Sequence, residues 1–340
     1  MPQNKQIHLD NRPEGEAVVG NFKLAVAQTP DLKEGDVLVR HHYLSLDPYM
    51  RGRMNAGKSY AQPQPLGATM GGGTAGEVIE SRNAAYPVGV KVVGMGGWQE
   101  YSVVSPRAIS AGALRVVDTT HVGLSHYLGA VGMPGVTAWY GLVKICTPKA
   151  GETMLVSAAT GAVGSAFAAL SKARGCRTVG IAGGAEKCAY AVNELGFDAC
   201  VDYKLHGDAP TLAKAIKEAC PNGVDGNFEN VGGMVLDAVM LNMNAFGRIA
   251  LCGMIAGYDG KPMPLSNPAL MLVNRLTLRG FIVAEHMDVW PEALAELGKM
   301  VATGKLRPRE SIAHGIEAAP EAFLGLLKGK NFGKQLVQLI

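Results

Sequence analysis

The sequence predicts an α/β protein in which a β-rich domain of the barrel or sandwich type is joined to a doubly wound parallel sheet. The chain of 340 residues is long enough for two domains. Short β-prone runs fill about the first 125 residues, and helical and strand segments alternate from about His126 onward. Glycine accounts for 44 of the 340 residues, nearly twice its average share of roughly 7%, which indicates many tight turns.

The β-rich part consists of short runs of β-branched, aromatic and aliphatic residues. Clusters such as Gly71-Gly72-Gly73 separate these runs, and this punctuation is typical of a barrel or a sandwich. The candidate strands are residues 22–27, 37–46, 76–81, 88–93 and 98–104.

The second part alternates strands with helices. Val163, Ala166, Phe167 and Leu170 share one face at the 3.6-residue period of an amphipathic helix. The candidate strands are residues 153–157, 177–182, 199–202, 224–229, 247–252 and 276–283. The candidate helices are residues 127–145, 162–174, 185–195, 209–220, 233–243 and 289–303. Six strands that alternate with helices predict a doubly wound parallel sheet.

The expected ligand site follows from this sheet, because ligands of doubly wound sheets bind beyond the carboxyl ends of the strands. The loops at that edge are residues 158–161, 183–186, 230–233 and 253–258. After Pro308 the pattern changes again, with a short helix expected over residues 320–328 and a strand over 335–339. We expect this tail to return to the first domain.

Composition argues against nucleic-acid and membrane partners. The formal net charge is +3 and charged residues make up 18% of the chain, so no strongly basic surface is expected. No stretch approaches the roughly 20 apolar residues of a membrane span, and the amino terminus lacks the apolar core of a signal peptide. The six cysteines are too widely spaced for a zinc knuckle or a secreted disulfide scaffold. We therefore expect a soluble, cytoplasmic protein with reduced cysteines.

Residues 157–164, Ser-Ala-Ala-Thr-Gly-Ala-Val-Gly, are the most informative motif of the chain. They follow an apolar strand candidate and precede a helix that begins at about Ala162. The free N–H groups and the positive dipole end of that helix favour an anion such as a diphosphate above the turn. Ala159 replaces the first glycine of the usual G-x-G-x-x-G pattern, so the strand–turn–helix context carries the prediction.

The end of the second nucleotide-fold strand discriminates between the nicotinamide cofactors. In NAD-binding sheets this strand ends in Asp or Glu, which binds the adenosine ribose hydroxyls. Here residues 177–182 are followed by Gly183-Gly184, and Lys187 lies three positions further on. A missing carboxylate leaves room for a 2′-phosphate, so NADPH is favoured with Lys187 on that phosphate. The alternative is a solvated helix lysine beside a first-turn Glu186.

The residues of the first domain argue against a catalytic zinc. No cysteine precedes Cys146, whereas a zinc-dependent dehydrogenase typically needs cysteine and histidine ligands in that part of the chain. His41 and His42 are adjacent in a strand candidate and should point to opposite faces, so the two cannot readily bind one ion. Hydride chemistry by this chain is therefore expected to work without a metal.

Five segments carry a resemblance to a known family. They are residues 44–51 (LSLDPYMR), 131–138 (VGMPGVTA), 150–164 (AGETMLVSAATGAVG), 228–233 (FENVGG) and 329–334 (GKNFGK). On these motifs the chain resembles the medium-chain dehydrogenase/reductase superfamily, and within it the zinc-free, NADPH-dependent alkenal/one double-bond reductases. That branch includes leukotriene B4 12-hydroxydehydrogenase/prostaglandin reductase and bacterial curcumin reductase. The resemblance extends almost from end to end.

The resemblance implies a domain organisation and a set of cofactor contacts. A GroES-like β-barrel catalytic domain would comprise residues 1–126 and 307–340, and a Rossmann domain with a six-stranded parallel sheet would comprise residues 127–306. Met133 and Thr137 would lie near the nicotinamide. From the residues alone, an alternative is that Asn230 and Asn331 do no more than hold turns and that Tyr203 does no more than cap a strand. The other implied contacts are Thr160, Gly161, Ala162, Val163, Gly164, Gly183, Lys187, Tyr203, Asn230, Cys252, Gly253, Met254, Ile255, Tyr258, Phe281, Ile282, Val283 and Asn331.

The resemblance also implies the reaction, which is reduction of the carbon–carbon double bond of an α,β-unsaturated ketone or aldehyde. Hydride from NADPH would reach the β-carbon and leave an enolate. Tyr258 and the cofactor ribose hydroxyl would donate hydrogen bonds to the enolate oxygen, because a tyrosine pKa of about 10 keeps the phenol protonated at neutral pH. Tyr258 or solvent would then protonate the α-carbon. The alternative for Tyr258 is an aromatic side chain that only packs on the cofactor.

Two tyrosines and two arginines are considered as substrate contacts. Tyr49 is expected to shape the substrate pocket, and Tyr60, in the loop of residues 54–67, is a candidate wall. Arg51 and Arg53 could meet an anionic substrate tail, but solvent-facing loop arginines are the favoured interpretation.

Several alternatives stay open from the sequence. One is an NADPH:quinone oxidoreductase of the same superfamily, and another is an NADPH-binding module without turnover. A zinc alcohol dehydrogenase is a third and more distant one. The resemblance further implies a homodimer in which the apolar edge strand near residues 276–283 pairs with its mate across a two-fold axis.

Overall fold

The computed structural model describes residues 2–57, 59–110 and 112–340, which fall into two units. The first unit joins the chain up to Leu128 to residues Glu310–Ile340, and the second comprises Gly129–Arg309. The boundaries expected from the sequence, after residues 126 and 306, lie within three residues of these. Among the described residues, no helix is long and apolar enough to cross a membrane.

The first unit is built around a seven-stranded sheet with the order β14-β15-β3-β4-β5-β7, and β6 pairs with β3 outside this path. Strands β1 and β2 form a separate antiparallel pair. The strands are β1 (Gln3–Leu9), β2 (Phe22–Gln28), β3 (Val37–Ser45), β4 (Thr74–Ser81), β5 (Lys91–Gly94), β6 (Tyr101–Val104), β7 (Leu114–Val116), β14 (Glu310–His314) and β15 (Lys334–Gln338). The helices are α1 (Tyr49–Arg53), α2 (Pro106–Ser110) and α10 (Ala319–Leu327).

The carboxyl-terminal segment belongs to the first unit because β15 pairs with the central strand β3, with Leu336 opposite Ser45.

An aromatic cluster lies in the core of the first unit. The Phe22 ring stacks on Trp98 at 5.6 Å, and Phe323 of α10 meets Trp98 edge-on at 5.5 Å between ring centroids. Burial of such rings is the main stabilising contribution of this core.

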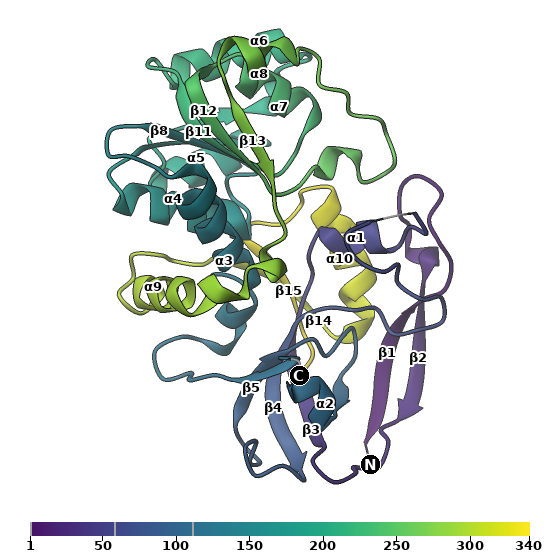
Figure 1. Cartoon of the computed structure of the whole chain (residues 1–340). Helices are drawn as coiled ribbons and strands as arrows, with labels where there is room; N and C mark the ends of the chain where they lie inside the picture. The colour runs from purple at the N-terminus through teal and green to yellow at the C-terminus, as the bar shows by residue number, and fades with distance from the viewer. Residues whose placement is uncertain (1, 58, 111) are drawn as a thin grey trace. The chain divides into compact units, whose positions relative to one another are not determined.

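The second unit is a six-stranded sheet in the order β10-β9-β8-β11-β12-β13, with every pair parallel. Strands β8, β11, β12 and β13 are labelled in Figure 1. The predicted doubly wound sheet is therefore confirmed. Its strands are β8 (Thr153–Ser157), β9 (Arg177–Ala182), β10 (Ala199–Asp202), β11 (Val224–Glu229), β12 (Met243–Leu251) and β13 (Thr277–Gly280). Its helices are α3 (Met133–Tyr140), α4 (Ala162–Ala173), α5 (Ala185–Asn193), α6 (Ala209–Ala219), α7 (Gly233–Met240), α8 (Ala269–Val273) and α9 (Trp290–Ala302).

The strand order places the switch point of the sheet between β8 and β11, which are neighbours although strands β9 and β10 lie between them in the chain. Helices α6, α7 and α8 pack on one face through apolar side chains such as Leu212 and Val239. On the other face, Phe167 of α4 meets Phe228 of β11 at 5.5 Å. A ligand is expected in the crevice at the carboxyl ends of β8 and β11.

The structure corrects several predicted boundaries. The helix predicted over residues 127–145 is interrupted: α3 begins only at Met133, and a π-helix over Gly141–Cys146 follows it. Strand β12 begins at Met243, four residues before its prediction, and β5 begins at Lys91 instead of residue 88. The predicted edge strand 276–283 is only the four residues of β13, because Val283 already lies in a 3-10 turn.

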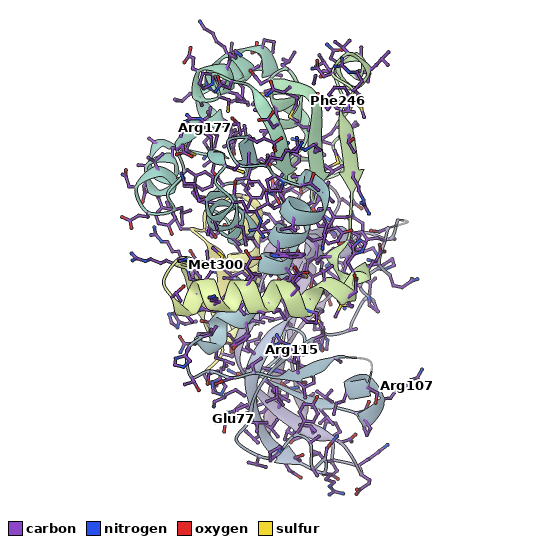
Figure 2. The ribbon with its side chains drawn as sticks, turned by 60° about the vertical axis from the view of Figure 1, so that its left-hand side comes forward. Glu77, Arg107, Arg115, Arg177, Phe246 and Met300 are labelled. Atoms are coloured by element: carbon purple, nitrogen blue, oxygen red, sulfur yellow. The ribbon has the colours of Figure 1, made fainter. Side chains whose placement is uncertain are left out.

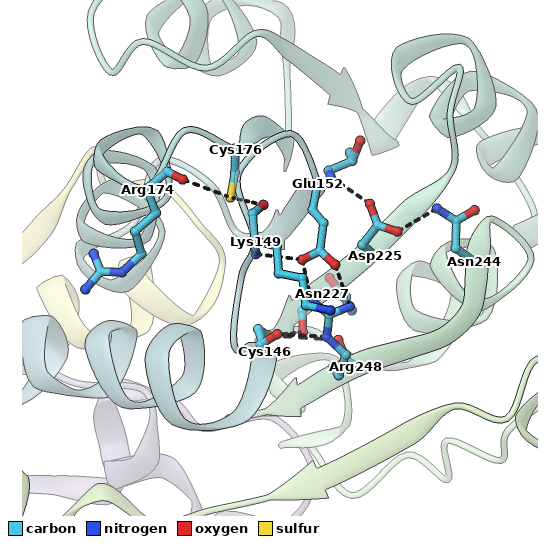
Figure 3. A network of polar contacts seen from close by, with 10 residues as sticks. Cys146, Lys149, Glu152, Arg174, Cys176, Asp225, Asn227, Asn244 and Arg248 are labelled. Atoms are coloured by element: carbon cyan, nitrogen blue, oxygen red, sulfur yellow. Dashed lines mark hydrogen bonds and ion pairs between the residues drawn. The ribbon is translucent and has the colours of Figure 1, made fainter.

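A polar network holds the amino edge of the second sheet, opposite the predicted site. Arg177, labelled in Figure 2, begins β9 and donates from Nη2 to the carbonyl of Ala219 at 2.8 Å. Farther along this edge, Figure 3 shows Arg248 of β12 bound to both oxygens of Glu152, at 2.5 and 3.1 Å. Arg248 Nε also donates to the carbonyl of Cys146 at 2.8 Å.

The Glu152–Arg248 pair predicts a loss of stability in acid. Burial alone would raise the pKa of Glu152, but hydrogen bonds from Arg248 and from the Lys149 amide outweigh it and hold this pKa below its ordinary value of 4.5. A depressed folded-state pKa stabilises the protein above the unfolded-state pKa, and this contribution is lost as pH falls through the folded-state pKa. Replacing Glu152 by Gln should therefore lower the free energy of unfolding at pH 7 by about 1 kcal/mol.

Urea unfolding at several pH values measures this difference. We expect the gap between wild type and Glu152→Gln to shrink once pH falls below the ordinary carboxyl pKa of 4.5. The exposed Glu218 on α6 supplies a control, and Glu218→Gln should follow the wild-type curve. A gap that stays constant down to pH 3 would contradict the assignment.

Candidate active site

The predicted anion-binding turn lies at the carboxyl end of β8, where α4 begins at Ala162 with Gly161 as its N-cap. Ala158 adopts a left-handed conformation with φ 53°, which turns the backbone sharply after the strand. An added Cβ at Gly164 would lie 2.5 Å from the carbonyl oxygen of Ala159, so only glycine lets the helix pack this closely on the turn. The amides of the first helical turn therefore face the crevice of the switch point.

A cationic cluster surrounds the end of β9. An added Cβ at Gly183 would lie 2.9 Å from the Tyr203 ring and 3.0 Å from Cε of Lys204, so both side chains fold over this glycine. Lys187, in the first turn of α5, is half-buried. Burial lowers its pKa, and the neighbouring charge of Lys204 lowers it further. Two ammonium groups that are near enough to affect each other electrostatically are suited to binding an anion.

Asp202 shapes this cluster without occupying the place of an acidic ribose ligand. Its Oδ1 accepts hydrogen bonds from the Gly184 amide at 2.8 Å and the Lys204 amide at 3.0 Å. The Asp202 carboxylate therefore accepts hydrogen bonds from the turns that carry Lys187 and Lys204.

Asn230 and the loop of residues 252–258 lie together at the ends of β11 and β12. The Asn230 side chain donates from Nδ2 to the carbonyl of Ser157 at 2.8 Å, which joins the ends of β8 and β11. The Ile255 amide donates to the Asn230 carbonyl at 3.2 Å. A Cβ at Gly253 would lie 3.3 Å from that carbonyl oxygen and 3.5 Å from the Tyr258 hydroxyl. The Tyr258 hydroxyl therefore lies over Gly253 beside Asn230, as a site donor requires.

Two other members of this loop are packed. Met254 lies against Gly232, where an added Cβ would be 3.3 Å from its Cε. Burial raises the pKa of the Cys252 thiol to about 12, and the nearby Glu229 carboxyl adds to this effect. A protonated thiol is a poor nucleophile, so Cys252 is protected from reaction with an electrophile.

The remaining predicted contacts of the second unit lie around α3 and after β13. Thr137 is buried and donates from Oγ1 to the carbonyl of Met133 at 2.7 Å, within the first turns of α3. The Phe281 ring packs on Phe228 at 6.0 Å and on Tyr140 at 5.2 Å, so a cofactor contact there would involve the backbone. Of the next two residues, Ile282 is half-buried and Val283 is buried.

A buried ion pair lies close in sequence to Tyr49 and Asn331, two predicted site residues of the first unit. Lys334 Nζ lies 2.7 Å from Oδ1 of Asp47 and 2.6 Å from the carbonyl of Leu46. Tyr49 follows Asp47 by two residues, and burial, reinforced by Asp47, raises the pKa of its phenol. Asn331 lies three residues before Lys334 and donates to the Gly333 carbonyl at 2.8 Å. The turn role considered for Asn331 is thus observed, and its cofactor contact stays a prediction.

The interpretation of Arg51 as solvent-facing is wrong. Its side chain is 1% exposed and donates to Asn55 Oδ1 at 2.8 Å and to the carbonyl of Gly15. It therefore holds the chain after β3 in place. Arg53 is half-buried and lies over the Tyr49 ring at 5.3 Å, whereas Tyr60 is 58% exposed.

His41 and His42 point away from each other, as expected for neighbours in a strand. His41 is buried and bonds Ser102 Oγ at 2.9 Å, while His42 faces Glu77 at 3.8 Å. Burial, helped by the charge of His42, lowers the pKa of His41 to about 3. Within residues 2–57, 59–110 and 112–340, no group of three or more His, Cys, Asp or Glu could hold a metal ion.

Sequence reasoning missed three side chains that organise the site: Lys204, Glu229 and Lys334. Lys204 follows Tyr203 directly. Because no acidic residue follows the strand at residues 177–182, a second lysine after the next strand could have indicated a phosphate site. Glu229 and Lys334 lie inside the quoted motifs, but their burial is visible only in the structure.

Comparison with known proteins agrees with this architecture. Residues 5–111 match the family described as the N-terminal domain of oxidoreductase, and residues 162–299 match the family described as zinc-binding dehydrogenase. The NADPH-dependent curcumin reductase of Escherichia coli (strain K12) is 44% identical, over 99% of this chain and 97% of the relative. Prostaglandin reductase 1 of Rattus norvegicus is 40% identical over 99% and 100%.

The chain belongs to the medium-chain dehydrogenase/reductase family, in its double-bond reductase branch. The predicted resemblance is thereby confirmed. The crystal structure of CurA in complex with NADPH from Vibrio vulnificus superposes with a TM-score of 0.92 at 42% identity and covers 99% of each chain. This enzyme is therefore an oxidoreductase of that fold.

Proposed function

We propose that this reductase uses NADPH to reduce the carbon–carbon double bond of α,β-unsaturated ketones and aldehydes. The observation that carries the proposal is the shared edge of the second sheet: the anion-binding turn before α4, Lys204 over Gly183, Lys187 in the first turn of α5 and the Tyr258 hydroxyl all lie there. Relatives named as NADPH-dependent curcumin reductase and 2-alkenal reductase (NADP(+)-dependent) support it. Consumption of NADPH on addition of an enone tests it.

The side chains present fit this cofactor. The first-turn amides of Ala162, Val163 and Gly164 are suited to a diphosphate, and Lys187, Lys204 and the Tyr203 hydroxyl are suited to a 2′-phosphate. When bound, NADPH supplies the hydride that adds to the β-carbon of the substrate.

Tyr258 has the central role among the protein groups in this proposal. Its hydroxyl donates a hydrogen bond to the carbonyl oxygen as negative charge develops there, and one such donor is worth about 3 kcal/mol. The α-carbon then takes a proton from Tyr258 or from solvent. Tyr49 and Tyr60 of the first unit are proposed to line the substrate pocket.

Replacing Lys187 by Met should raise the KM for NADPH about 10- to 100-fold, because a charged hydrogen bond to phosphate contributes about 1.5–3 kcal/mol. The KM for NADH, which lacks the 2′-phosphate, should stay within about twofold. Steady-state kinetics with both cofactors measures the preference. Lys214→Met, which removes an exposed lysine from α6, is the matched control. Equal increases in KM for the two cofactors would contradict the phosphate role.

We also propose a homodimer formed through the free edge of the second sheet, in a protein of the cytoplasm. Strand β13 is the last strand of the sheet, and Thr277, Arg279 and Gly280 are exposed. Exposed apolar side chains lie near this edge. Leu272, shortly before β13, is 81% exposed, and Phe246 of β12, labelled in Figure 2, is 66% exposed and donates its amide to the Asn274 carbonyl at 2.7 Å. Light scattering should find twice the chain mass of 35.7 kDa, and a monomer would contradict the proposal.

A further inference from the structure

Glu229 is a buried carboxylate at the switch point of the second sheet. It ends β11, is 0% exposed, and every polar contact it makes among the described residues is with a neutral donor. Its Oε1 accepts hydrogen bonds from Ser157 Oγ at 2.8 Å, the Val231 amide at 2.7 Å and the Gly232 amide at 2.9 Å. Its Oε2 accepts from Asn227 Nδ2 at 3.1 Å. All four groups donate, which matches an ionised carboxylate that can only accept.

The contacts of Glu229 link three segments of the candidate site. Ser157 passes the connection on, because its Oγ accepts the Asn230 amide at 2.8 Å. The main-chain carbonyl of Glu229 accepts the amides of Cys252 and Gly253 at 2.9 and 3.1 Å. The end of β8, the turn after β11 and the start of the Tyr258 loop are therefore all bonded to this one residue.

The two amides bound by Oε1 lie just before α7, which begins at Gly233. Amides at a helix start, together with the positive dipole end, attract anions. Helices α4 and α7 follow the neighbouring strands β8 and β11, so two such helix starts lie at the same edge. At α7 the anion is already supplied by the protein, whereas at α4 the turn is left for a ligand.

We propose that Glu229 is a positioning residue: its carboxylate acts as an internal anion for α7, which directs a bound dinucleotide to the turn before α4 and holds Asn230 and the Tyr258 loop in register. Only the part that concerns Tyr258 rests on the proposed function. The effect on cofactor binding does not.

The test is chemical rescue of Glu229→Ala. Removing the carboxylate should raise the Kd for NADPH about tenfold, because four donors lose their acceptor. It should lower kcat/KM for the enone about 100-fold, since a shift of about 1 Å in a positioned group costs that much. Formate fits the vacated space and presents two oxygens, so adding it should restore both values at least about tenfold. NADPH binding, followed by fluorescence without substrate, reports on Glu229 even if enone reduction itself fails.

Two variants separate positioning from packing. Glu229→Gln keeps an acceptor for the three Oε1 donors, and its amide can donate to Asn227 Oδ1, a buried oxygen that has no partner in the wild type. Because the Gln amide keeps these hydrogen bonds but lacks the negative charge, we expect Glu229→Gln to fall between wild type and Glu229→Ala in both measurements. Leu236→Ala also opens a buried space beside the sheet, in α7, but formate should not improve it.

A folded Glu229→Ala enzyme with wild-type NADPH affinity, or one that formate does not rescue, would overturn the proposal. If Glu229→Ala does not fold, the Ser157→Ala variant tests the proposal instead. This variant removes the hydroxyl between Glu229 and Asn230, and a folded protein with kcat/KM lowered about tenfold would support the proposal. Wild-type kcat/KM in that variant would overturn it.

Discussion

Tyr258→Phe is expected to lower kcat about 100-fold while the Kd for NADPH changes less than about twofold. The hydroxyl lies beside Asn230 and over Gly253, at the edge where the anion-binding turn also lies. Phenylalanine keeps the ring and its packing, so only the donor to the developing enolate is lost. Stopped-flow measurement of hydride transfer, with NADPH affinity measured separately by fluorescence, distinguishes the two effects.

Tyr86→Phe is the matched control for this experiment. Its hydroxyl donates to the carbonyl of Leu114 at 2.9 Å in the first unit, and we expect its loss to leave turnover unchanged. Wild-type turnover in Tyr258→Phe would remove Tyr258 from the mechanism and leave it as an aromatic side chain that packs on the cofactor. A loss confined to NADPH affinity would lead to the same conclusion.

Lys334→Met is expected to lower the free energy of unfolding by about 3–5 kcal/mol, because it leaves the Asp47 carboxylate buried without a counter-charge. Lys334 is 4% exposed and Asp47 is 6% exposed. Since the pair joins the chain after β3 to the start of β15, activity should fall together with stability. Urea unfolding followed by circular dichroism measures the difference.

The double variant Asp47→Asn/Lys334→Met makes the prediction specific. Without the buried charge, the second change should recover more than about half of the lost stability, since a neutral amide costs much less to bury than a lone carboxylate. Additive losses in the double variant would mean that the pair acts through packing alone. The exposed pair of Lys5 and Glu317 offers a contrast, because removing Lys5 should leave stability nearly unchanged.

The strands of the second sheet were predictable where burial on both faces makes an apolar run visible. Strands β8 and β9 begin and end at the predicted residues, because all five residues of β8 and five of the six in β9 are buried. Strand β14, Glu-Ser-Ile-Ala-His, was missed since it lies at a sheet edge and its polar composition is typical of a loop. The break in the helix predicted over 127–145 depends on tertiary packing, with Gly141 against the Phe228 ring.

The candidate site was predictable in part for the same reason. The turn before α4 and the absence of an acid after β9 are local features, and sequence reasoning found both. That Lys204 folds over Gly183 depends on the pairing of β9 with β10, which no local pattern specifies. Glu229 was missed because its four donors come from two strand ends and a turn. Arg51 was misjudged because an arginine in a loop motif is usually solvated, whereas here it is buried.

The most direct test of the central claim is NADPH oxidation with 3-nonen-2-one, followed at 340 nm and repeated with NADH, with the product identified by mass spectrometry. We predict the saturated ketone, formed much faster with NADPH than with NADH. An allylic alcohol would show that the carbonyl is reduced and would contradict the mechanism. NADPH binding with no oxidation by the enone, or oxidation only by a small quinone, would contradict the proposed function.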